Sequence, residues 1–353
     1  MHEITLNLHI HTTYSDGSLT HREIARAAIH CGLDALLITD HNVYVGDKQG
    51  YYEEGGRKIL LLVGEEIHNP ARQPQKSHLL VFGAGKELAE YGYEPQLLIN
   101  RVKDAGGICF LAHPYDPALP AFGEDNISWA DWEVTGYSGI ELWNSFSELK
   151  VHVHNKLQAI FYAFFPHFYP HQPPKQTLII WNKLLKKGVK VVAIGGSDVH
   201  ASRHNMGPLS RIIFPYEFHF NAVNSHLLLP KPLTGKTNED SQSIIKAMRN
   251  GSGFIGYDLP APTRGFRFSA ETPSGEIQMG EEGRLKGKTI LKINLPSSAE
   301  CHLIRNGETI QQWVGVTKIQ HLVEKSGVYR IECYHRYLGR RRGWIFSNPI
   351  YIR

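Results

Sequence analysis

Histidine and carboxylate side chains follow short apolar segments at many points along the first 200 residues. His9 and His11 are two residues apart at the end of an apolar segment that has the pattern of a β-strand. Because alternate side chains of a strand point to the same face, both imidazoles can bind one metal ion. Further candidates end later apolar segments or lie beside them: Asp16, Asp40, His41, Glu66, His78, His113, Asp198 and His200. Scattered surface residues do not account for this repeated placement, which predicts a metal site.

The chemistry that such side chains support is metal-assisted hydrolysis. Mixed imidazole and carboxylate ligands suit Zn²⁺, Mn²⁺ or Fe²⁺, and the sequence does not select among zinc, manganese and iron. Divalent cations lower the pKa of a bridging water, and the resulting hydroxide attacks an electrophilic centre. The ions also neutralise the charge that develops on the substrate oxygens.

Alternating strands and helices are the elements that must position these residues. Thr20 and Glu23 form the pattern of a capping box, so a helix is expected to begin there and to end at Gly32. Other helices are predicted at residues 96–104, 148–164 and 176–187. Strands are predicted at residues 4–8, 35–38, 59–63, 79–82, 108–112, 139–142 and 189–194. In a parallel α/β barrel the carboxyl ends of the strands open on one face, where the candidate ligands would converge.

The pattern changes after a proline-rich junction at residues 259–263. Strand-like segments then follow one another without a helical pattern between them, and Asn306-Gly307 is typical of a tight hairpin. This predicts a small β-sandwich. We therefore expect two domains, an α/β domain at residues 1–262 and a β-sandwich-like domain of unknown role at residues 263–353.

Composition and charge narrow the class of protein. With 42% hydrophobic and 20% charged residues, the chain is typical of a globular protein with a sizeable core. A net charge of +4 suits an anionic substrate but is too small to favour nucleic acid. The N-terminus lacks the features of a signal peptide and the apolar segments are too short to span a bilayer, so we expect a cytoplasmic protein without a membrane partner. The cysteines contain no C-x-x-C pair and are expected to be reduced, with pairing of Cys301 and Cys333 as the alternative.

The candidate residues lie in motifs that have a characteristic order. Along the chain these read H-x-H-T, S-D-G, T-D-H, G-x-E, a lone His before an apolar segment, A-H-P and S-D-x-H. This order resembles the PHP (polymerase and histidinol phosphatase) family over residues 1 to about 260, and the full chain looks similar to its CehA/McbA subgroup of metallohydrolases. The resemblance implies a distorted (β/α)7 barrel that holds two or three divalent metal ions in residues 1–262.

The same resemblance assigns the ligands residue by residue. One ion would be held by His9, His11, Glu66 and Asp198, a second by Glu66, His78 and His113, and a third by Asp16, His41 and His200. Glu66 rather than Glu65 fits the G-x-E motif, and adjacent strand residues face opposite sides. Asp40 would orient an imidazole by accepting its N–H. Asn7 stands where the family often has aspartate.

Three residues are expected to act on the substrate. Asp198 or His200 would assist protonation of the leaving oxygen, and Arg203 would hold an anionic substrate oxygen unless it is an ordinary solvated arginine. The segment at residues 165–174 is expected to be a packed surface loop, with an active-site lid as the alternative, and the arginines at 340–342 to lie at a hairpin tip, with nucleic-acid contact as the alternative. Surface or loop positions are expected for His68, His152, His154, His167, His171 and His204.

The function expected from these residues is that of a phosphoesterase acting on a small phosphorylated molecule or nucleotide through a metal-bridging hydroxide. The alternative is an ester, amide or carbamate hydrolase that uses the same cluster. A phosphate site should offer cations, whereas a carbamate site should offer an apolar wall, which the aromatic residues at 164–169 would suit. A non-catalytic, metal-stabilised binding module is a third reading, although all nine ligand positions are filled here.

Overall fold

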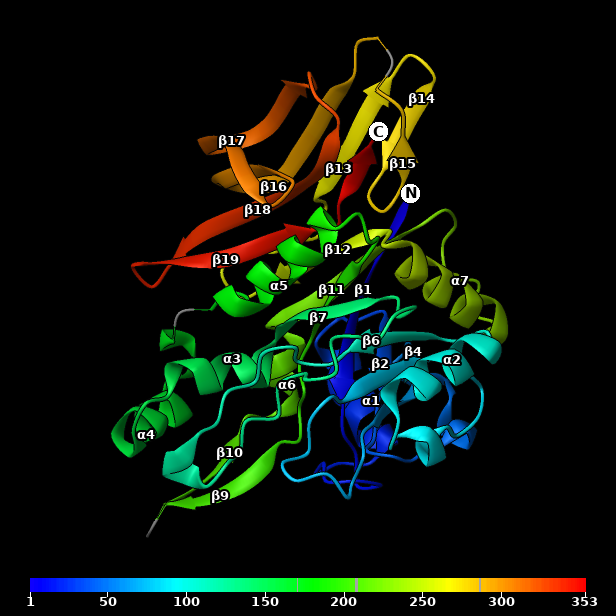
Figure 1. Ribbon diagram of the computed structural model, residues 1–353. Coiled ribbons are helices and arrows are strands. Elements are labelled where there is room, and N and C mark those ends of the chain that lie inside the picture. The colour runs from blue at the N-terminus through cyan, green and yellow to red at the C-terminus, as the bar shows by residue number, and fades with distance from the viewer. Residues whose placement is uncertain (170, 207–208, 286) are drawn as a thin grey trace.

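The computed structural model describes residues 1–169, 171–206, 209–285 and 287–353, and it is a mixed α/β protein with one large sheet (Figure 1). Strands and helices are interspersed in the first 200 residues, but the predicted alternation is incomplete, because the four strands between residues 35 and 82 follow one another without an α-helix. These elements are β1 (His2–Ile10), α1 (His21–His30), β2 (Ala35–Ile38), β3 (Gly50–Glu54), β4 (Arg57–Ile67), β5 (Leu79–Phe82), α2 (Pro95–Asp104), β6 (Ile108–Leu111), β7 (Gly139–Asn144), α3 (Ser145–His152), α4 (Lys156–Phe164), α5 (Lys175–Lys186) and β8 (Val192–Gly196).

The strands of this part, apart from β3, which pairs with the first half of β4, form a ring. β2 pairs in parallel with β1 and with β4, and β7 pairs in parallel with β6 and with β8. β5 joins the two sets by antiparallel pairing with β4 and β6. Just after β8, a parallel bridge between Val199 and Ile10 returns to the end of β1. The carboxyl ends of β1, β4, β6 and β8 therefore lie on one rim.

The reversed direction of β5 explains the position of His78. In a parallel strand the amino end lies on the rim opposite to the carboxyl ends. Because β5 runs antiparallel to its neighbours, its amino end, next to His78, lies on the same rim as the carboxyl ends of β4 and β6. His78, which precedes β5, therefore lies near His113, which follows β6.

The segment after β8 adds a hairpin and two more strands to this ring. β9 (Ser202–Met206) and β10 (Leu209–Ile213) pair only with each other among the described strands and extend at the lower edge of Figure 1. α6 (Tyr216–Phe220), β11 (Val223–Leu229), α7 (Thr237–Asn250) and β12 (Gly253–Tyr257) follow. β11 pairs with β1 and with β12. β11 lies within residues 215–238, where the sequence predicted no strand because its polar residues interrupt the apolar pattern.

The C-terminal part consists of strands, as predicted. These are β13 (Arg267–Thr272), β14 (Gly275–Gln278), β15 (Glu282–Gly283), β16 (Ile290–Arg305), β17 (Glu308–Leu322), β18 (Gly327–Tyr337), β19 (Arg340–Ser347) and β20 (Ile350–Ile352). Asn306 and Gly307 have positive φ angles of 52° and 85° at the turn between β16 and β17, the conformation expected for this hairpin. β19 pairs with β12, so the sheet runs without interruption across residue 262. Cys301 lies opposite Cys333 in the β16–β18 pair, and both thiols are free.

Several local predictions differ from the structure. The single helix expected at residues 148–164 is two, because Asn155 accepts a hydrogen bond from Gln158 N and begins a new helix, α4. The loop at residues 165–174 is packed on one side, with Tyr169 buried and Phe165 and Phe168 exposed, while Pro170 lies outside the described residues. Arg342, expected at an exposed hairpin tip, is buried and donates to Tyr169 O and His167 O. None of the described helices is long and apolar enough to cross a bilayer.

Candidate metal centre

A cavity of about 600 Å³ opens on the rim where the candidate ligands gather. Seven of the nine predicted ligands line it, and the other two, His9 and His11, are fully buried and contact the lining carboxylates of Glu66 and Asp198. A larger cavity of about 730 Å³, between α7 and β5, contains none of them. We therefore take the smaller cavity as the candidate site.

Glu66 is the centre of the cluster. It lies near the end of strand β4, after the buried apolar residues 59–63, and is 1% exposed. Its Oε1 lies 2.8 Å from His78 Nδ1 and 3.0 Å from His113 Nε2. Its Oε2 lies 3.1 Å from His9 Nε2, 3.3 Å from His11 Nε2 and 3.1 Å from His41 Nδ1. One carboxylate thus contacts five imidazoles.

Glu65 points away from the cluster, as the strand alternation requires. Its side chain accepts a hydrogen bond from Leu88 N at 3.1 Å. Burial raises the pKa of the Glu65 carboxyl to about 8. The expected register of this strand, with Glu66 facing the site, agrees with the contacts.

Asp198 closes the buried end of the cluster. Its Oδ1 lies 3.3 Å from Nε2 of both His9 and His11. Three of the candidate ligands have positive φ angles, 61° for His9, 27° for His113 and 53° for Asp198. Such left-handed backbone is costly for residues other than glycine and is found preferentially at functional sites. The chain adopts these conformations where the side chains must turn into the cavity.

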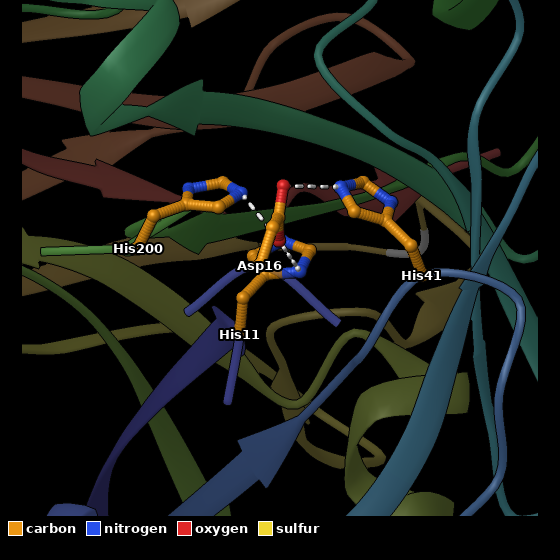
Figure 2. A group of neighbouring side chains, drawn as sticks. All are labelled: His11, Asp16, His41 and His200. Atoms are coloured by element: carbon orange, nitrogen blue, oxygen red, sulfur yellow. Dashed lines mark ion pairs between the residues drawn. The ribbon is translucent and has the colours of Figure 1, made fainter. Parts of the chain in front are cut away.

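Asp16 lies at the solvent side of the cluster, between His200 and His41 (Figure 2). Its Oδ1 lies 3.3 Å from His200 Nε2 and 3.7 Å from His11 Nδ1, and its Oδ2 lies 3.6 Å from His41 Nε2. The Asp16 side chain is 55% exposed, whereas that of Glu66 is 1% exposed. These residues therefore face an incoming substrate.

Several donor atoms of the cluster lack hydrogen bonds, which tests whether metal ions fit here. Among the described residues, the buried atoms without a hydrogen-bond partner include His9 Nε2, both ring nitrogens of His11, His41 Nδ1, Glu66 Oε2, His78 Nε2 and His113 Nδ1. Leaving such groups buried and unsatisfied is costly, so a ligand is expected to satisfy them. Imidazole and carboxylate donors suit a borderline divalent cation such as Zn²⁺, Mn²⁺ or Fe²⁺. The residues therefore fit metal ions.

The donor atoms form overlapping groups. Within each group they lie within 4.8 Å of one another. The groups are His9, His11, Glu66 and Asp198; Glu66, His78 and His113; His11, Asp16, His41 and His200; and His41, His68 and His78. The first two correspond to two predicted ligand sets, and the third adds His11 to the predicted set.

The carboxylates dominate the electrostatics of the cluster. Burial opposes charge on His11, but contacts with Asp198 and Glu66 outweigh it and raise the pKa of His11 to about 9. Burial likewise opposes charge on Glu66, but the surrounding imidazoles hold the pKa of this carboxyl well below its ordinary value. Burial also opposes charge on Asp198, but its imidazole neighbours, chiefly His9, hold the pKa of this carboxyl well below its ordinary value. The cluster thus attracts positive charge.

Glu141 orients the cluster, a role that the sequence analysis missed. Its Oε1 lies 2.9 Å from His9 Nδ1, and its Oε2 accepts a hydrogen bond from His113 N at 2.9 Å. Asn144 donates to Glu141 Oε2 and to Asp198 Oδ2. Glu141 and Asn144 are polar positions in the otherwise apolar strand β7, which is the one sequence signal that marks them.

The prediction that Asp40 accepts a hydrogen bond from an imidazole is wrong. Asp40 accepts hydrogen bonds from Thr12 N, Thr12 Oγ1 and Ser15 Oγ, and from no imidazole of the described residues. It therefore fixes the turn that carries Asp16. Asn7 binds Ser197, Val223 and Asn224, so it supports the framework rather than a ligand.

Two of the histidines expected at the surface or in loops are buried. His68 is 6% exposed and its ring stacks on His78 with centroids 4.4 Å apart, so it belongs to the cluster. Burial lowers the pKa of His68 to about 4. His171 is buried beside Tyr169 and Tyr257. His154 and His204 are exposed, as expected.

The structure places Arg203 away from the cavity. After His200 the chain leaves the rim and enters β9, where Arg203 is exposed and donates to Ser210 Oγ at 3.3 Å. Arg203 is not among the residues that line the cavity, so its expected contact with substrate is not supported. The lysine of the lining is Lys150, which pairs with Asp116 and, at 3.3 Å, with Glu124.

Part of the chain matches the model of a known protein family. Residues 7–103, which include six of the nine predicted ligands, match the family model of the PHP domain. The chain is 26% identical to the uncharacterized protein MJ1587 of Methanocaldococcus jannaschii over 151 residues, 40% of this chain and 81% of that protein. Similar solved structures include the following two. The first, a two-domain protein from Bacteroides vulgatus that contains a predicted PHP-like metal-dependent phosphoesterase, is 14% identical and covers 99% of this chain and 95% of that one at a TM-score of 0.45. The second, a protein from Bifidobacterium adolescentis proposed to be a metal-dependent phosphoesterase, is 17% identical and covers 59% and 92% at a TM-score of 0.36.

Proposed function

We propose that this chain, a metal-dependent hydrolase that carries a PHP domain, is a phosphoesterase acting on a small phosphorylated molecule or nucleotide. One observation supports the proposal most strongly. Buried imidazole and carboxylate atoms without hydrogen-bond partners face one cavity in overlapping groups. Such an arrangement is costly unless cations bind to it.

Three ions would use the nine candidate ligands as follows. His9, His11, Glu66 and Asp198 would hold one, and His78 and His113 would share Glu66 to hold a second. Asp16, His41 and His200 would hold a third at the solvent side. When bound, zinc, manganese or iron would neutralise charge on the substrate and make a water a better nucleophile.

The side chains of this protein would position the groups that react. Glu141 and Asn144 hold His9, His113 and Asp198 in place from behind. His200 directs its Nδ1 to Asp198 O at 3.0 Å, so its Nε2 is left to face Asp16 and the cavity. We propose His200 as the residue that assists protonation of the leaving oxygen; Asp198, whose pKa is held well below its ordinary value, stays an ionised ligand, and Arg203 has no role in this step.

Charge favours an anionic substrate. The ions would bring positive charge to the centre of the cavity, and Lys150 lines its wall. Burial alone lowers the pKa of Lys150, but Asp116 and Glu124 outweigh it and raise that pKa, so the ammonium form is kept. A phosphate group would meet the bound ions and Lys150 in such a cavity, whose wall also carries Asp116, Glu124 and Asp125.

One observation favours a second candidate, hydrolysis of a carbon-centred ester, amide or carbamate. A mainly apolar cavity adjoins the metal cavity and shares Glu124, Phe146 and Lys150 with it. An apolar wall suits a neutral ester. The two candidates differ in the bond that is broken and share the metal cluster.

We also propose how the chain divides. The ring of strands in residues 1–262 would be the distorted (β/α)7 barrel that carries the site, and residues 263–353 would form the β-sandwich-like domain. Most of one apolar core, built largely from β13, β16, β18 and β19, lies in the second unit, and Leu228 and Phe254 of the first unit complete it.

A substrate screen tests the proposed function. Protein loaded with zinc, manganese or iron in turn should be assayed with phosphomonoesters, phosphodiesters, carboxylic esters and carbamates of matched size. We expect hydrolysis of phosphate esters, abolished by prolonged chelation. Faster hydrolysis of neutral esters than of any phosphate ester would select the second candidate, and turnover that survives chelation would contradict both.

A further inference from the structure

A second cavity lies beside the metal cavity, under helix α4. It has a volume of about 70 Å³, and nine of its twelve lining side chains are apolar. Glu124, Phe146 and Lys150 line both cavities, so the two adjoin. The proposed function assigns no role to this second cavity.

The walls of this apolar cavity come from four segments, which are residues 119–124, residues 146–153, helix α4 and the β9–β10 hairpin with Phe214. Ala159 and Ala163, one turn apart on α4, form one wall, and Val153 forms another. Phe214, just after the β9–β10 hairpin, closes the far side. Val153, Ala163 and Phe214 are at most 5% exposed, so the inner end is buried.

Arg211 holds the hairpin against α4. Its Nε donates to Ala163 O at 2.5 Å, and its guanidinium lies over the ring of Phe164 at 4.7 Å. These contacts fix the opposite walls relative to each other. The cavity is therefore built into the fold.

The boundary between the two cavities is polar. Lys150 is held there by Asp116 and Glu124, and Ser147 Oγ donates to Asp116 at 2.5 Å. A molecule that spans both cavities would place its polar end among the candidate ligands and its apolar end under α4.

We propose that the organic group of the substrate binds in this apolar cavity and is a small branched aliphatic group of about three or four carbons. The cavity is about half the size of one of roughly 150 Å³ that admits benzene, so an aromatic ring or a nucleobase does not fit. The inference rests on the proposed hydrolysis at the metal cluster, but not on whether phosphorus or carbon is attacked. It narrows the substrate from any small phosphate ester or nucleotide to an aliphatic ester.

Filling the cavity tests the inference. Ala159→Leu and Ala163→Leu add bulk inside it, and Ile160→Phe, on the exposed face of the same helix, is the matched control. The substrates are methyl phosphate, isobutyl phosphate and a nucleoside monophosphate. We expect the wild type to favour isobutyl over methyl phosphate by on the order of 10-fold or more in kcat/KM, since each methylene in an apolar pocket contributes on that scale.

The two filling variants should lose this preference while keeping their rate on methyl phosphate, and Ile160→Phe should keep both. Val153→Ala, which enlarges the cavity, should shift the preference towards the longer isopentyl ester. An unchanged preference in Ala159→Leu and Ala163→Leu, its absence from the wild type, or faster turnover of the nucleotide would overturn the inference. Thermal unfolding identifies a variant that misfolds. If both filling variants misfold, the substrate preference of Val153→Ala alone tests the inference.

Calorimetry separates this inference from the proposed function. Isobutylphosphonate and methylphosphonate, which cannot be hydrolysed as esters, are titrated into the metal-loaded protein. Tighter binding of isobutylphosphonate with a more negative heat-capacity change, lost in Ala163→Leu, supports the cavity even if no phosphate ester is hydrolysed. Equal binding of both phosphonates by the wild type contradicts it.

Discussion

Oε1 of Glu141 lies 2.9 Å from Nδ1 of His9, and both side chains are fully buried. The other ring nitrogen of His9 faces Glu66 and Asp198 at 3.1 and 3.3 Å. A carboxylate behind an imidazole fixes its orientation and raises the basicity of the nitrogen that binds a metal. Glu141 therefore prepares His9 as a ligand.

Replacing Glu141 with Gln should weaken metal binding without removing a ligand. Loss of such a supporting carboxylate typically costs 10- to 100-fold in metal affinity. The measurement is competition with a chelator of known affinity. Glu65→Gln is the control, because Glu65 is as buried as Glu141 but contacts Leu88 N. Equal metal affinities for Glu141→Gln and wild type would show that Glu141 does not support metal binding.

Lys150, rather than Arg203, should be the cation that substrate binding depends on. A hydrogen bond to a charged group contributes about 1.5–3 kcal/mol, so Lys150→Met should raise KM for a phosphate ester by about 10-fold or more. Arg203→Ala should change KM by less than about threefold, since surface changes have small effects.

The Lys150 substitution needs a second variant, since it leaves Asp116 buried without its partner. An unpaired buried charge destabilises a fold. Lys150→Met combined with Asp116→Asn removes both charges and should recover thermal stability but not KM. A large increase in KM for Arg203→Ala, together with an unchanged KM for Lys150→Met, would show that Arg203 and not Lys150 binds the substrate.

The contrast between these two cations shows what the sequence could predict. The nine candidate ligands end or adjoin apolar strands, and strand direction alone brings such residues to one rim, so their gathering was predictable. Arg203 is only three residues from His200, but it lies in the β9–β10 hairpin, which leads away from the cavity. The distance along the sequence does not predict this change of direction.

Other features of the site show similar limits of sequence distance. His68 lies in the loop after β4, as expected, but it is buried, because its ring stacks on that of His78. Glu141 lies in β7, and its partners His9 and His113 come from β1 and from the segment after β6, a proximity that is not visible in the sequence. That the nine residues bind metal stays a prediction.

Glu148 should make stability depend on pH. It is buried, accepts hydrogen bonds from Trp143 Nε1 and Gln172 N, and has a pKa that burial raises to about 8. Because the folded-state pKa lies above the unfolded value of 4.5, the folded state holds the proton more tightly. The contribution is complete below about pH 4.5 and is lost as pH rises towards 8, by at most roughly 1.4 kcal/mol per pH unit.

Glu148→Gln removes this titration. Denaturant unfolding of both proteins at several pH values between 4.5 and 8.5 measures the difference. The stability of the variant relative to wild type should rise steadily with pH over this window and then level off. A difference that does not change with pH would show that Glu148 ionises in the folded protein as it does in the unfolded chain.

The number of metal ions held by wild type and Glu66→Gln tests the metal cluster most directly. Elemental analysis of wild type loaded with zinc, manganese or iron should give two to three equivalents per chain, with hydrolysis lost on chelation. Glu66→Gln removes the carboxylate that contacts five imidazoles and should lose metal and activity together, whereas Glu65→Gln should keep both. Less than one equivalent in wild type, or an active Glu66→Gln protein beside an inactive Glu65→Gln protein, would contradict this account of the site.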